Sequence, residues 1–287
     1  MATSIDSVEE LPGTPPIVHI SDIHGYLDEA QSALLAVGEI SPFDPIVELD
    51  ESGTLHWADN EYVLIFNGDM IDRGPDSEAC LNLVWRLMEE APAGHVRYNL
   101  GNHEMSMLLP SLFSWPDVYS TNVSADMRRD FLSKIEAGTI TAAFEGYNYT
   151  YNHAGTTDPV EPAMLNQSLR EASSELLAAP EAGLDPSFQK KIERSYPRLF
   201  KLGENGGRGP SAGILWLDFA HLEKSAPPQI VGHTQKSRAV RKGNVVCGNV
   251  IRMNLHSDHG EGVLYETSES LTYVYRERDG STYTMEP

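Results

Sequence analysis

The stretch FNGDMIDRGPDSE, residues 66–78, follows the apolar run YVLI and sets two aspartates, Asp69 and Asp72, three positions apart. An arginine and a Gly-Pro break come directly after them. Carboxylates this close repel each other, and each is costly to remove from water. A strand that ends in a turn and has no further function usually carries only one carboxylate at that point. We therefore expect a cationic group beside these carboxylates.

The length and charge of the chain limit its fold and its partners. With 287 residues and a mass of 31.7 kDa, it can bury one substantial core. We expect a single domain over residues 16–287, after a disordered N-terminus over residues 1–15. The formal net charge of −21 repels nucleic acid and anionic membranes at long range, so we expect neither as a partner. We interpret this charge as a solvated, halophilic surface, because salt screens its self-repulsion.

Three features of the sequence predict a cytoplasmic protein. The two cysteines, Cys80 and Cys247, belong to no CxxC pair, so neither a disulfide framework nor a zinc site is expected. The opening residues, MATSIDSVEELPGTPP, contain no basic segment followed by an apolar one, which argues against a signal peptide. No stretch approaches the 18 apolar residues that a membrane-spanning helix needs.

Apolar runs and helical periodicities alternate over the first hundred residues. Strands are expected at residues 16–21, 61–67 and 95–100, with helices at residues 28–37 and 76–90 between them. Strands that are apolar nearly throughout are typical of a sheet that is buried on both faces. The pattern therefore predicts an α/β fold.

The remaining chain is expected to form helical insertions and a β-rich end. Residues 104–140 and 157–212 are rich in helix formers interrupted by proline, and TAAFEGYNYTYNHAG between them predicts a hairpin that turns near Gly146. Past residue 234, the short alternating runs NVVCGNVIRMN, GVLYET and LTYVYRER predict antiparallel strands.

Five of the expected strands end in side chains that can bind metal ions. The motifs are SDIHG, NGDMIDRG, GNHE, HAG and GHT, and the candidate ligands in them are Asp22, His24, Asp69, Asn102, His153 and His233. In each motif a glycine allows a sharp turn, and a polar side chain follows the strand at its carboxyl end, where open α/β sheets place their sites. Ordinary turn chemistry explains one such motif far more easily than five.

This series of motifs resembles the calcineurin-like metallophosphoesterases, and most of all their phosphoprotein phosphatase branch. That branch includes bacterial and phage Ser/Thr phosphatases and symmetrical dinucleoside tetraphosphatases. The resemblance covers about residues 17–255, and Asp-Arg-Gly together with Asn-His-Glu is specific to the branch. It implies a four-layer α/β/β/α sandwich of two mixed sheets around two divalent metal ions, manganese first, with iron or zinc as alternatives.

The resemblance also implies a division of the ligands between two metals. Asp22, His24 and Asp69 would hold the first metal, and Asp69, Asn102, His153 and His233 the second, with Asp69 bridging. Mixed carboxylate, imidazole and amide ligands suit Mn²⁺, Fe²⁺ or Zn²⁺ better than Ca²⁺. Two such metals, roughly 3.5–4 Å apart, can acidify a bridging water to hydroxide and hold a phosphoryl group for in-line attack.

The neighbouring residues receive roles from the same resemblance. Arg73 would bind two phosphate oxygens with its planar guanidinium group. His103 would donate a proton to the leaving group, and Asp72 would orient the imidazole of His103.

Two positions depart from the family pattern. Ser21 stands where the family usually has glycine, which is a small-for-small change. Many relatives carry a second phosphate-binding arginine shortly after a tryptophan, whereas this chain has Leu217 and Asp218 there. Arg208 or Arg238 would have to supply that charge from another backbone position, and a solvated loop charge is an equally good interpretation of Arg208.

These observations predict a hydrolase of phosphate monoesters that acts on phosphoproteins or small phosphate esters. Symmetrical hydrolysis of dinucleoside polyphosphates is the enzymatic alternative. A non-catalytic scaffold is the alternative of a different class, although every expected ligand position and His103 are filled. Four aromatic side chains of the insertions are available as walls for a substrate, although we expect most of them to pack within the insertions' own small core: Trp115, Tyr119, Tyr196 and Phe200. The basic stretch Lys236, Arg238, Arg241 and Lys242 would either attract phosphorylated substrates or protect an edge strand.

Overall fold

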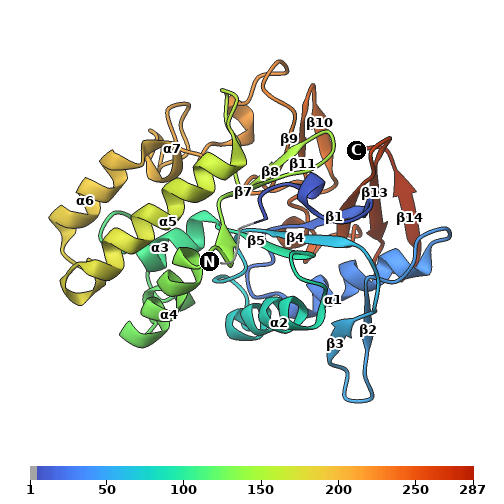
Figure 1. Cartoon of the computed structure of the whole chain (residues 1–287). Coiled ribbons are helices and arrows are strands. Elements are labelled where there is room, and N and C mark those ends of the chain that lie inside the picture. Colours follow the sequence, from blue (N-terminus) through green and yellow to red (C-terminus); the bar gives the residue numbers. More distant parts are fainter. Residues whose placement is uncertain (1–4) are drawn as a thin grey trace.

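Two β-sheets packed face to face form the centre of the molecule in a computed structural model that describes residues 5–287 (Figure 1). Side chains of both sheets share one apolar core, which includes Ile65 and Leu264 from one sheet and Phe144 and Ile230 from the other. A second core lies between the outer face of the larger sheet and the helices that cover it. This architecture confirms the predicted α/β fold with two mixed sheets.

The larger sheet has seven strands in the order β14-β13-β12-β1-β4-β5-β6. Their bounds are β1 Ile17–Ile20, β4 Val63–Asn67, β5 Val96–Asn99, β6 Ile140–Thr141, β12 Gly262–Glu266, β13 Leu271–Arg276 and β14 Thr282–Met285. Strands β1, β4, β5 and β6 run parallel, while β12 pairs antiparallel with β1. The loops that follow β1, β4 and β5 therefore emerge at one edge of the sheet.

The smaller sheet has five strands in the order β10-β11-β9-β8-β7. Their bounds are β7 Ala143–Glu145, β8 Thr150–Asn152, β9 Gln229–Val231, β10 Val240–Lys242 and β11 Val245–Cys247. Strands β8 and β9 are parallel neighbours, so the loops after them lie side by side. A separate hairpin of β2 (Val47–Leu49) and β3 (Leu55–Trp57) projects from the body of the molecule (Figure 1).

Two sets of helices surround the sheets. Helices α1 (Leu27–Leu35) and α2 (Ser77–Glu90) pack on the larger sheet, with Cys80 buried on the apolar face of α2. The helices of the expected insertions are α3 (Asn102–Leu108), α4 (Ala125–Glu136), α5 (Pro162–Ala178), α6 (Pro186–Ser195) and α7 (Pro197–Phe200), which gather on one side of the molecule (Figure 1). None of the helices within residues 5–287 is long and apolar enough to cross a membrane.

The N-terminal segment differs from the expected disorder over residues 1–15. Residues 1–4 lie outside the described part of the chain. From residue 5 on, the segment is ordered: Val8 and Leu11 are buried in the core between the sheets, and Ser7 forms a β-bridge with Glu145. The polar composition of this segment makes these two apolar residues hard to recognise: Val8 opens a single turn of 3-10 helix at Val8–Glu10, and Leu11 follows it.

The stretch NVVCGNVIRMN, residues 244–254, also differs from expectation. Strand β11 pairs antiparallel with β10, as expected, but its other neighbour β9 is parallel, and the chain then leaves the sheet to form the short helix α8 (Ile251–Asn254). The turn occurs at Gly248, where a Cβ atom would lie only 2.9 Å from the imidazole of His19. The antiparallel pairing expected of the other two runs is confirmed for β12 and β13.

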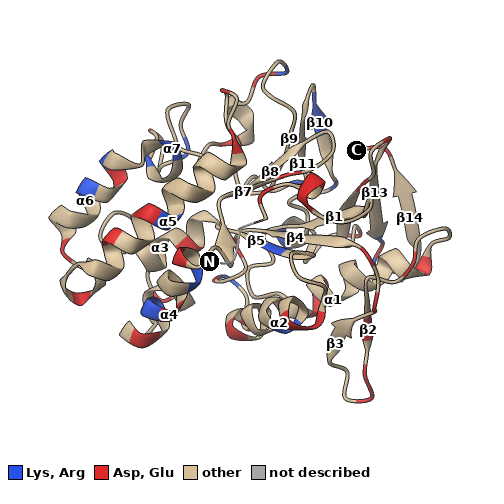
Figure 2. Cartoon of the chain, in the orientation of Figure 1, with Lys and Arg blue, Asp and Glu red and all other residues tan. Residues whose placement is uncertain are grey.

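Acidic residues are distributed over helices, loops and the β2–β3 hairpin throughout the molecule (Figure 2). They include exposed residues of the β2–β3 hairpin, such as Glu48, Asp50 and Glu51. This wide distribution is the one expected of solvated charge.

Candidate metal centre and proton donor

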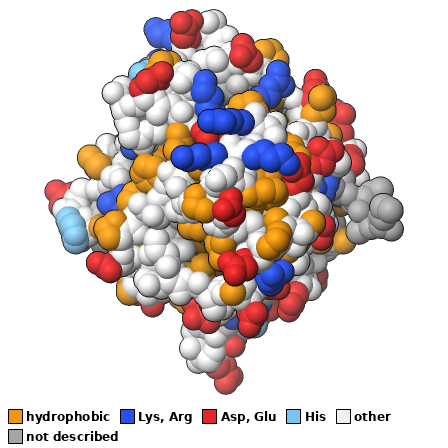
Figure 3. Space-filling view, turned by 90° about the vertical axis from the view of Figure 1, so that its left-hand side faces the viewer, with side chains coloured by type: hydrophobic (Ala, Val, Ile, Leu, Met, Phe, Trp, Pro, Cys, Tyr) orange, Lys and Arg blue, Asp and Glu red, His pale blue; other side chains and the backbone are white. Residues whose placement is uncertain are grey.

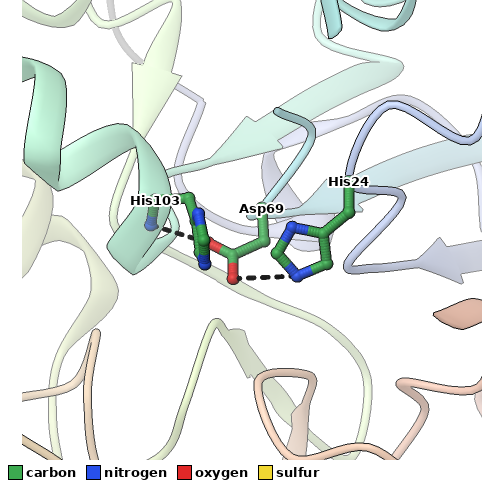
Figure 4. A group of neighbouring side chains, drawn as sticks. All are labelled: His24, Asp69 and His103. Atoms are coloured by element: carbon green, nitrogen blue, oxygen red, sulfur yellow. Dashed lines mark hydrogen bonds and ion pairs between the residues drawn. The ribbon is translucent and has the colours of Figure 1, made fainter. Parts of the chain in front are cut away.

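All six candidate ligands lie directly after strands of the two sheets. Asp22 and His24 follow β1, Asp69 follows β4, Asn102 opens α3 after β5, His153 follows β8, and His233 follows β9. In Figure 4, Asp69 lies between His24 and His103, and the three residues come from different segments of the chain. The two sheets thus bring ligands that are more than two hundred residues apart to one place.

The backbone at this place is strained. Asp22, His24, Asp69 and His233 have φ angles between 52° and 59°, in the left-handed region that residues other than glycine seldom adopt. Gly68, before Asp69, has a φ of 85°, and a Cβ atom there would lie 2.6 Å from Nδ1 of His153. Strain of this kind persists only where the surrounding structure imposes it, and it clusters at functional sites.

The first group of ligand atoms surrounds one carboxylate oxygen of Asp69. Nδ1 of His24 donates a hydrogen bond to the carbonyl oxygen of Ile71 (3.0 Å), so the lone pair of the neutral ring is on Nε2. Burial lowers the pKa of His24 to about 3, which keeps the ring neutral. Its Nε2 nevertheless lies 3.5 Å from Oδ2 of Asp69 and 3.9 Å from Oδ1 of Asp22. Lone pairs that face one another in this way repel, and a cation between them would remove the repulsion.

Asp22 supports the same conclusion. Its Oδ2 accepts a hydrogen bond from the backbone N–H of His233 (2.9 Å), whereas Oδ1 is buried and has no hydrogen-bond partner among the described residues. Burial raises the pKa of Asp22 to about 7, because no protein group neutralises it fully. A metal ion at Oδ1 would remove this cost.

The second group of ligand atoms surrounds the amide oxygen of Asn102. Oδ1 of Asn102 lies 3.0 Å from Nε2 of His153 and 2.9 Å from Nδ1 of His233. Nδ1 of His153 donates to the carbonyl oxygen of Asn67, which leaves Nε2 facing both Asn102 and, at 3.5 Å, Oδ2 of Asp69. Nε2 is therefore the ring atom of His153 that is available to a cation.

The pKa of His153 reflects the negative charge of Asp69, whereas burial dominates the pKa of His233. Burial lowers the pKa of His153, but the charge and hydrogen bond of Asp69 outweigh it and raise the pKa to about 9. Burial lowers the pKa of His233 well below its usual range. The negative charge of Asp69 thus stabilises a proton on His153 and would stabilise a metal ion at the same place. Nitrogen and oxygen donors in this mixture fit a divalent transition metal.

Asp69 belongs to both groups of ligand atoms. One ligand atom each from His24, Asp69 and His103 lies within 4.8 Å of the others, and the same holds for Asp69, His153 and His233. Asp69 is 2% exposed, and although burial opposes it, the nearby histidines lower its pKa well below the usual range. The arrangement can hold two cations with one carboxylate between them.

A hydrogen-bonded pair lies beside the ligands. Nδ1 of His103 donates to Oδ2 of Asp72 over 2.6 Å, which leaves Nε2 facing the guanidinium of Arg73, 3.5 Å from its Nη2. Burial raises the pKa of Asp72, but the hydrogen bonds from His103 and Ser120 outweigh it and lower the pKa. The backbone N–H of His103 donates to Oδ1 of Asp69, which fixes the pair relative to the ligands.

Comparison with known proteins identifies the family. The family model described as calcineurin-like phosphoesterase matches residues 15–185. The chain belongs to the calcineurin-like phosphoesterases. A relative, the asymmetrical bis(5'-nucleosyl)-tetraphosphatase PrpE of Oceanobacillus iheyensis, is 33% identical over 225 residues, which cover 75% of this phosphoesterase and 80% of that protein. The crystal structure of a cold-active protein-tyrosine phosphatase of a psychrophilic Shewanella species matches with a TM-score of 0.63 at 18% identity, over 100% of this chain and 83% of that one.

The arginines of the phosphoesterase lie in different surroundings. Nη2 of Arg208 pairs with Oδ2 of Asp218 (2.8 Å) and also donates to Oγ1 of Thr234 (3.2 Å). The aspartate that stands where an arginine was expected therefore holds Arg208, and the charge of Arg208 contributes to the lowered pKa of His233. Arg238 pairs with Glu277, and no contact within residues 5–287 joins it to a candidate ligand.

Several residues of the site were not identified from the sequence. Glu104 is fully buried, and its carboxylate accepts from the backbone N–H groups of Asp69, Met70 and Gly101. Its place in the GNHE motif was the available signal. Arg252 on α8 is close enough for its charge to lower the pKa of Arg73 and of His24, and no sequence signal pointed to it.

The basic stretch at residues 236–242 includes β10, which is the edge strand of the smaller sheet. Lys236 and Lys242 both lie over the ring of Phe219. A second group of cations, which no sequence motif indicated, is visible on the face formed by α6 and α7 (Figure 3). Its exposed members are Lys190, Lys191, Arg194, Arg198 and Lys201.

Replacing Asp69 tests the shared ligand. We expect Asp69→Asn to lose most bound metal, because the amide has one oxygen donor and no charge for two cations. Elemental analysis of manganese-loaded protein should then find well under one metal per chain. Asp76→Asn, an exposed aspartate of the same motif, is the matched control and should bind metal as the parent does. Two metals retained in Asp69→Asn would contradict the shared role.

Replacing Arg208 tests the substitute phosphate contact. Because its side chain is 40% exposed, we expect Arg208→Ala to lower kcat/KM and weaken inhibition by inorganic phosphate by roughly tenfold, the lower end for a charge-assisted hydrogen bond. The double variant Arg208→Ala/Asp218→Asn shows whether the loss remains without the unpaired carboxylate. Arg238→Ala is the control. Kinetics equal to the parent in both Arg208 variants would make it a surface residue.

Proposed function

We propose that this protein is a dinuclear metal-dependent phosphoesterase that hydrolyses phosphate monoesters. The observation that carries the proposal is that Asp69 faces candidate ligands on both sides, with Nε2 of His24 and Nε2 of His153 each 3.5 Å from its Oδ2. Asp22, His24 and Asp69 would hold one metal, and Asp69, Asn102, His153 and His233 the other. Bound there, two divalent ions, with manganese as our first choice, would supply an acidified water as nucleophile and neutralise phosphoryl charge.

The residues beside the metal centre have separate tasks in this proposal. His103 donates a proton from Nε2 to the oxygen of the leaving group, which departs poorly as an alkoxide. Asp72 holds the ring through Nδ1, so that Nε2 is the atom that carries the transferred proton. Arg73 binds phosphoryl oxygens through its planar guanidinium, and its position beside Nε2 of His103 brings the two groups to one substrate.

Asymmetrical hydrolysis of a dinucleoside tetraphosphate is the second candidate. The PrpE relative carries this activity in its name and covers most of the chain, which favours this candidate over the symmetrical hydrolysis considered from the sequence. Arg208 and Arg252, in addition to Arg73, are cations that would suit a substrate with several phosphates. A scaffold without activity is disfavoured, since the ligand atoms converge and the His103–Asp72 pair is complete.

A single set of assays separates these candidates. Manganese-loaded protein is offered a phosphoserine peptide, a phosphotyrosine peptide, p-nitrophenyl phosphate and diadenosine tetraphosphate, and the products are resolved by chromatography. We expect release of inorganic phosphate from the monoesters at a kcat/KM well above that for the dinucleotide. A dominant yield of AMP and ATP would favour the second candidate, and two ADP would indicate symmetrical cleavage. Hydrolysis of none of them, with two metals bound, would refute the enzymatic proposal.

A further inference from the structure

The segment between α3 and α4, residues 109–124, lies against the His103–Asp72 pair. It begins where α3 ends and finishes at Ser124, whose side chain caps α4 by accepting from the backbone N–H of Met127. The side chain of Gln189 on α6 accepts from the backbone N–H of Ser111, so the segment is also held by the second insertion. Both of its ends are thus fixed to helices.

Ser120 provides two of the three hydrogen bonds that the Asp72 carboxylate accepts. Its backbone N–H donates to Oδ1 and its hydroxyl donates to Oδ2, each over 2.8 Å. The third comes from Nδ1 of His103. A carboxylate with donors on both oxygens cannot rotate without losing one of them, and Ser120 is itself only 2% exposed. Ser120 therefore fixes the direction in which Asp72 holds the imidazole.

Trp115 contacts the other two members of the proton-donating side. Its ring is parallel to the imidazole of His103, at 0° and with 3.8 Å between the centroids. The guanidinium carbon of Arg73 lies 5.1 Å from the Trp115 ring centroid, within the range of a cation–π contact. Phe113 and the buried Trp216 pack against Trp115 in turn. The indole ring of Trp115, packed against these two aromatic side chains, thus contacts both His103 and Arg73.

We propose that residues 109–124 form a positioning strap for the proton donor of this site, in which Ser120 orients Asp72 and Trp115 holds His103 and Arg73. This inference rests on the proposed phosphoesterase function. Arg73 has an exposed side chain, and an arginine ordered before binding loses less entropy when it meets the phosphate. The parallel ring prevents the imidazole from swinging away from the leaving group. Neither Ser120 nor Trp115 needs to touch the substrate for these effects.

The strap also changes the interpretation of the aromatic residues. Trp115 was expected to be available as a wall for a substrate base, but its face is already covered by His103. Phe200 is fully buried, and the hydroxyl of Tyr196 donates to Glu175 on α5. Trp115 therefore acts on the catalytic pair itself, and its loss should matter for substrates with and without a base.

Kinetics with two leaving groups test the strap. The variants are Ser120→Ala, Trp115→Ala and Trp115→Phe, with the exposed Ser114→Ala as the matched control and His103→Asn as the reference for a lost proton donor. A phosphoserine peptide needs a proton on its leaving oxygen, whereas p-nitrophenolate departs almost without one. Each variant is loaded with manganese and assayed on both substrates, and inhibition by inorganic phosphate is measured in parallel.

We expect a pattern that a merely structural role would not produce. Ser120→Ala should lower kcat for the peptide by about fivefold and leave p-nitrophenyl phosphate within about twofold, a small part of the 10²–10⁴ expected for His103→Asn. Trp115→Ala should lower kcat for the peptide by roughly 10- to 100-fold and, through Arg73, weaken phosphate inhibition several-fold. Trp115→Phe, which keeps a ring against the imidazole, should recover most of both losses.

Hydrogen exchange provides a readout that is independent of activity. Amides of residues 109–124 should exchange faster in Ser120→Ala and Trp115→Ala than in the parent or in Ser114→Ala. Equal slowing of both substrates, or no change in either rate or exchange, would overturn the strap. A parent protein that hydrolyses no phosphate ester would instead refute the proposed function, while the exchange data would still decide whether the segment is held by these contacts.

Discussion

The carboxylate of Asp69 is buried beside two other buried carboxylates, and among the described residues its charge is offset mainly by the imidazole of His153. Isolating one charge from water costs several kcal/mol, and here the buried carboxylates of Asp22 and Glu104 lie nearby. The nearest imidazole of the first group, His24, is held neutral by burial. Two cations on either side of Asp69 would balance this charge. The left-handed backbone, the glycine at position 68 and the buried Glu104 all serve to hold Asp69 in this place.

The sequence was sufficient for the part of the site that follows strands. A buried strand, a glycine and a polar side chain form a local pattern, and the parallel order of β1, β4 and β5 brings three such patterns to one edge. The contacts of Ser120 and Trp115 could not be predicted, because they join an irregular segment to residues about forty positions earlier or to a neighbouring helix. The expectations that failed at Val8 and at α8 did so for the same reason. A short apolar pattern does not reveal which part of the protein it will pack against.

The insertions give this phosphoesterase its individual features. Asp218 stands where an arginine was expected, and it forms an ion pair with Arg208. The guanidinium of Arg208 therefore places a positive charge near His233 from a different loop. The segment before α4 contacts the proton donor, and α6 and α7 carry a cationic face on an otherwise acidic protein (Figure 3). The sheets thus position the candidate metal ligands, while the insertions form the surroundings in which a substrate would be selected.

The central claim is that two metal ions share Asp69. Crystals grown with manganese and measured at the manganese absorption edge locate such ions directly by anomalous scattering. We expect two peaks, roughly 3.5–4 Å apart, with the carboxylate of Asp69 between them and with His24 beside one peak and His153 and His233 beside the other. A single peak at saturating manganese, or two peaks that both lie away from Asp69, would contradict it.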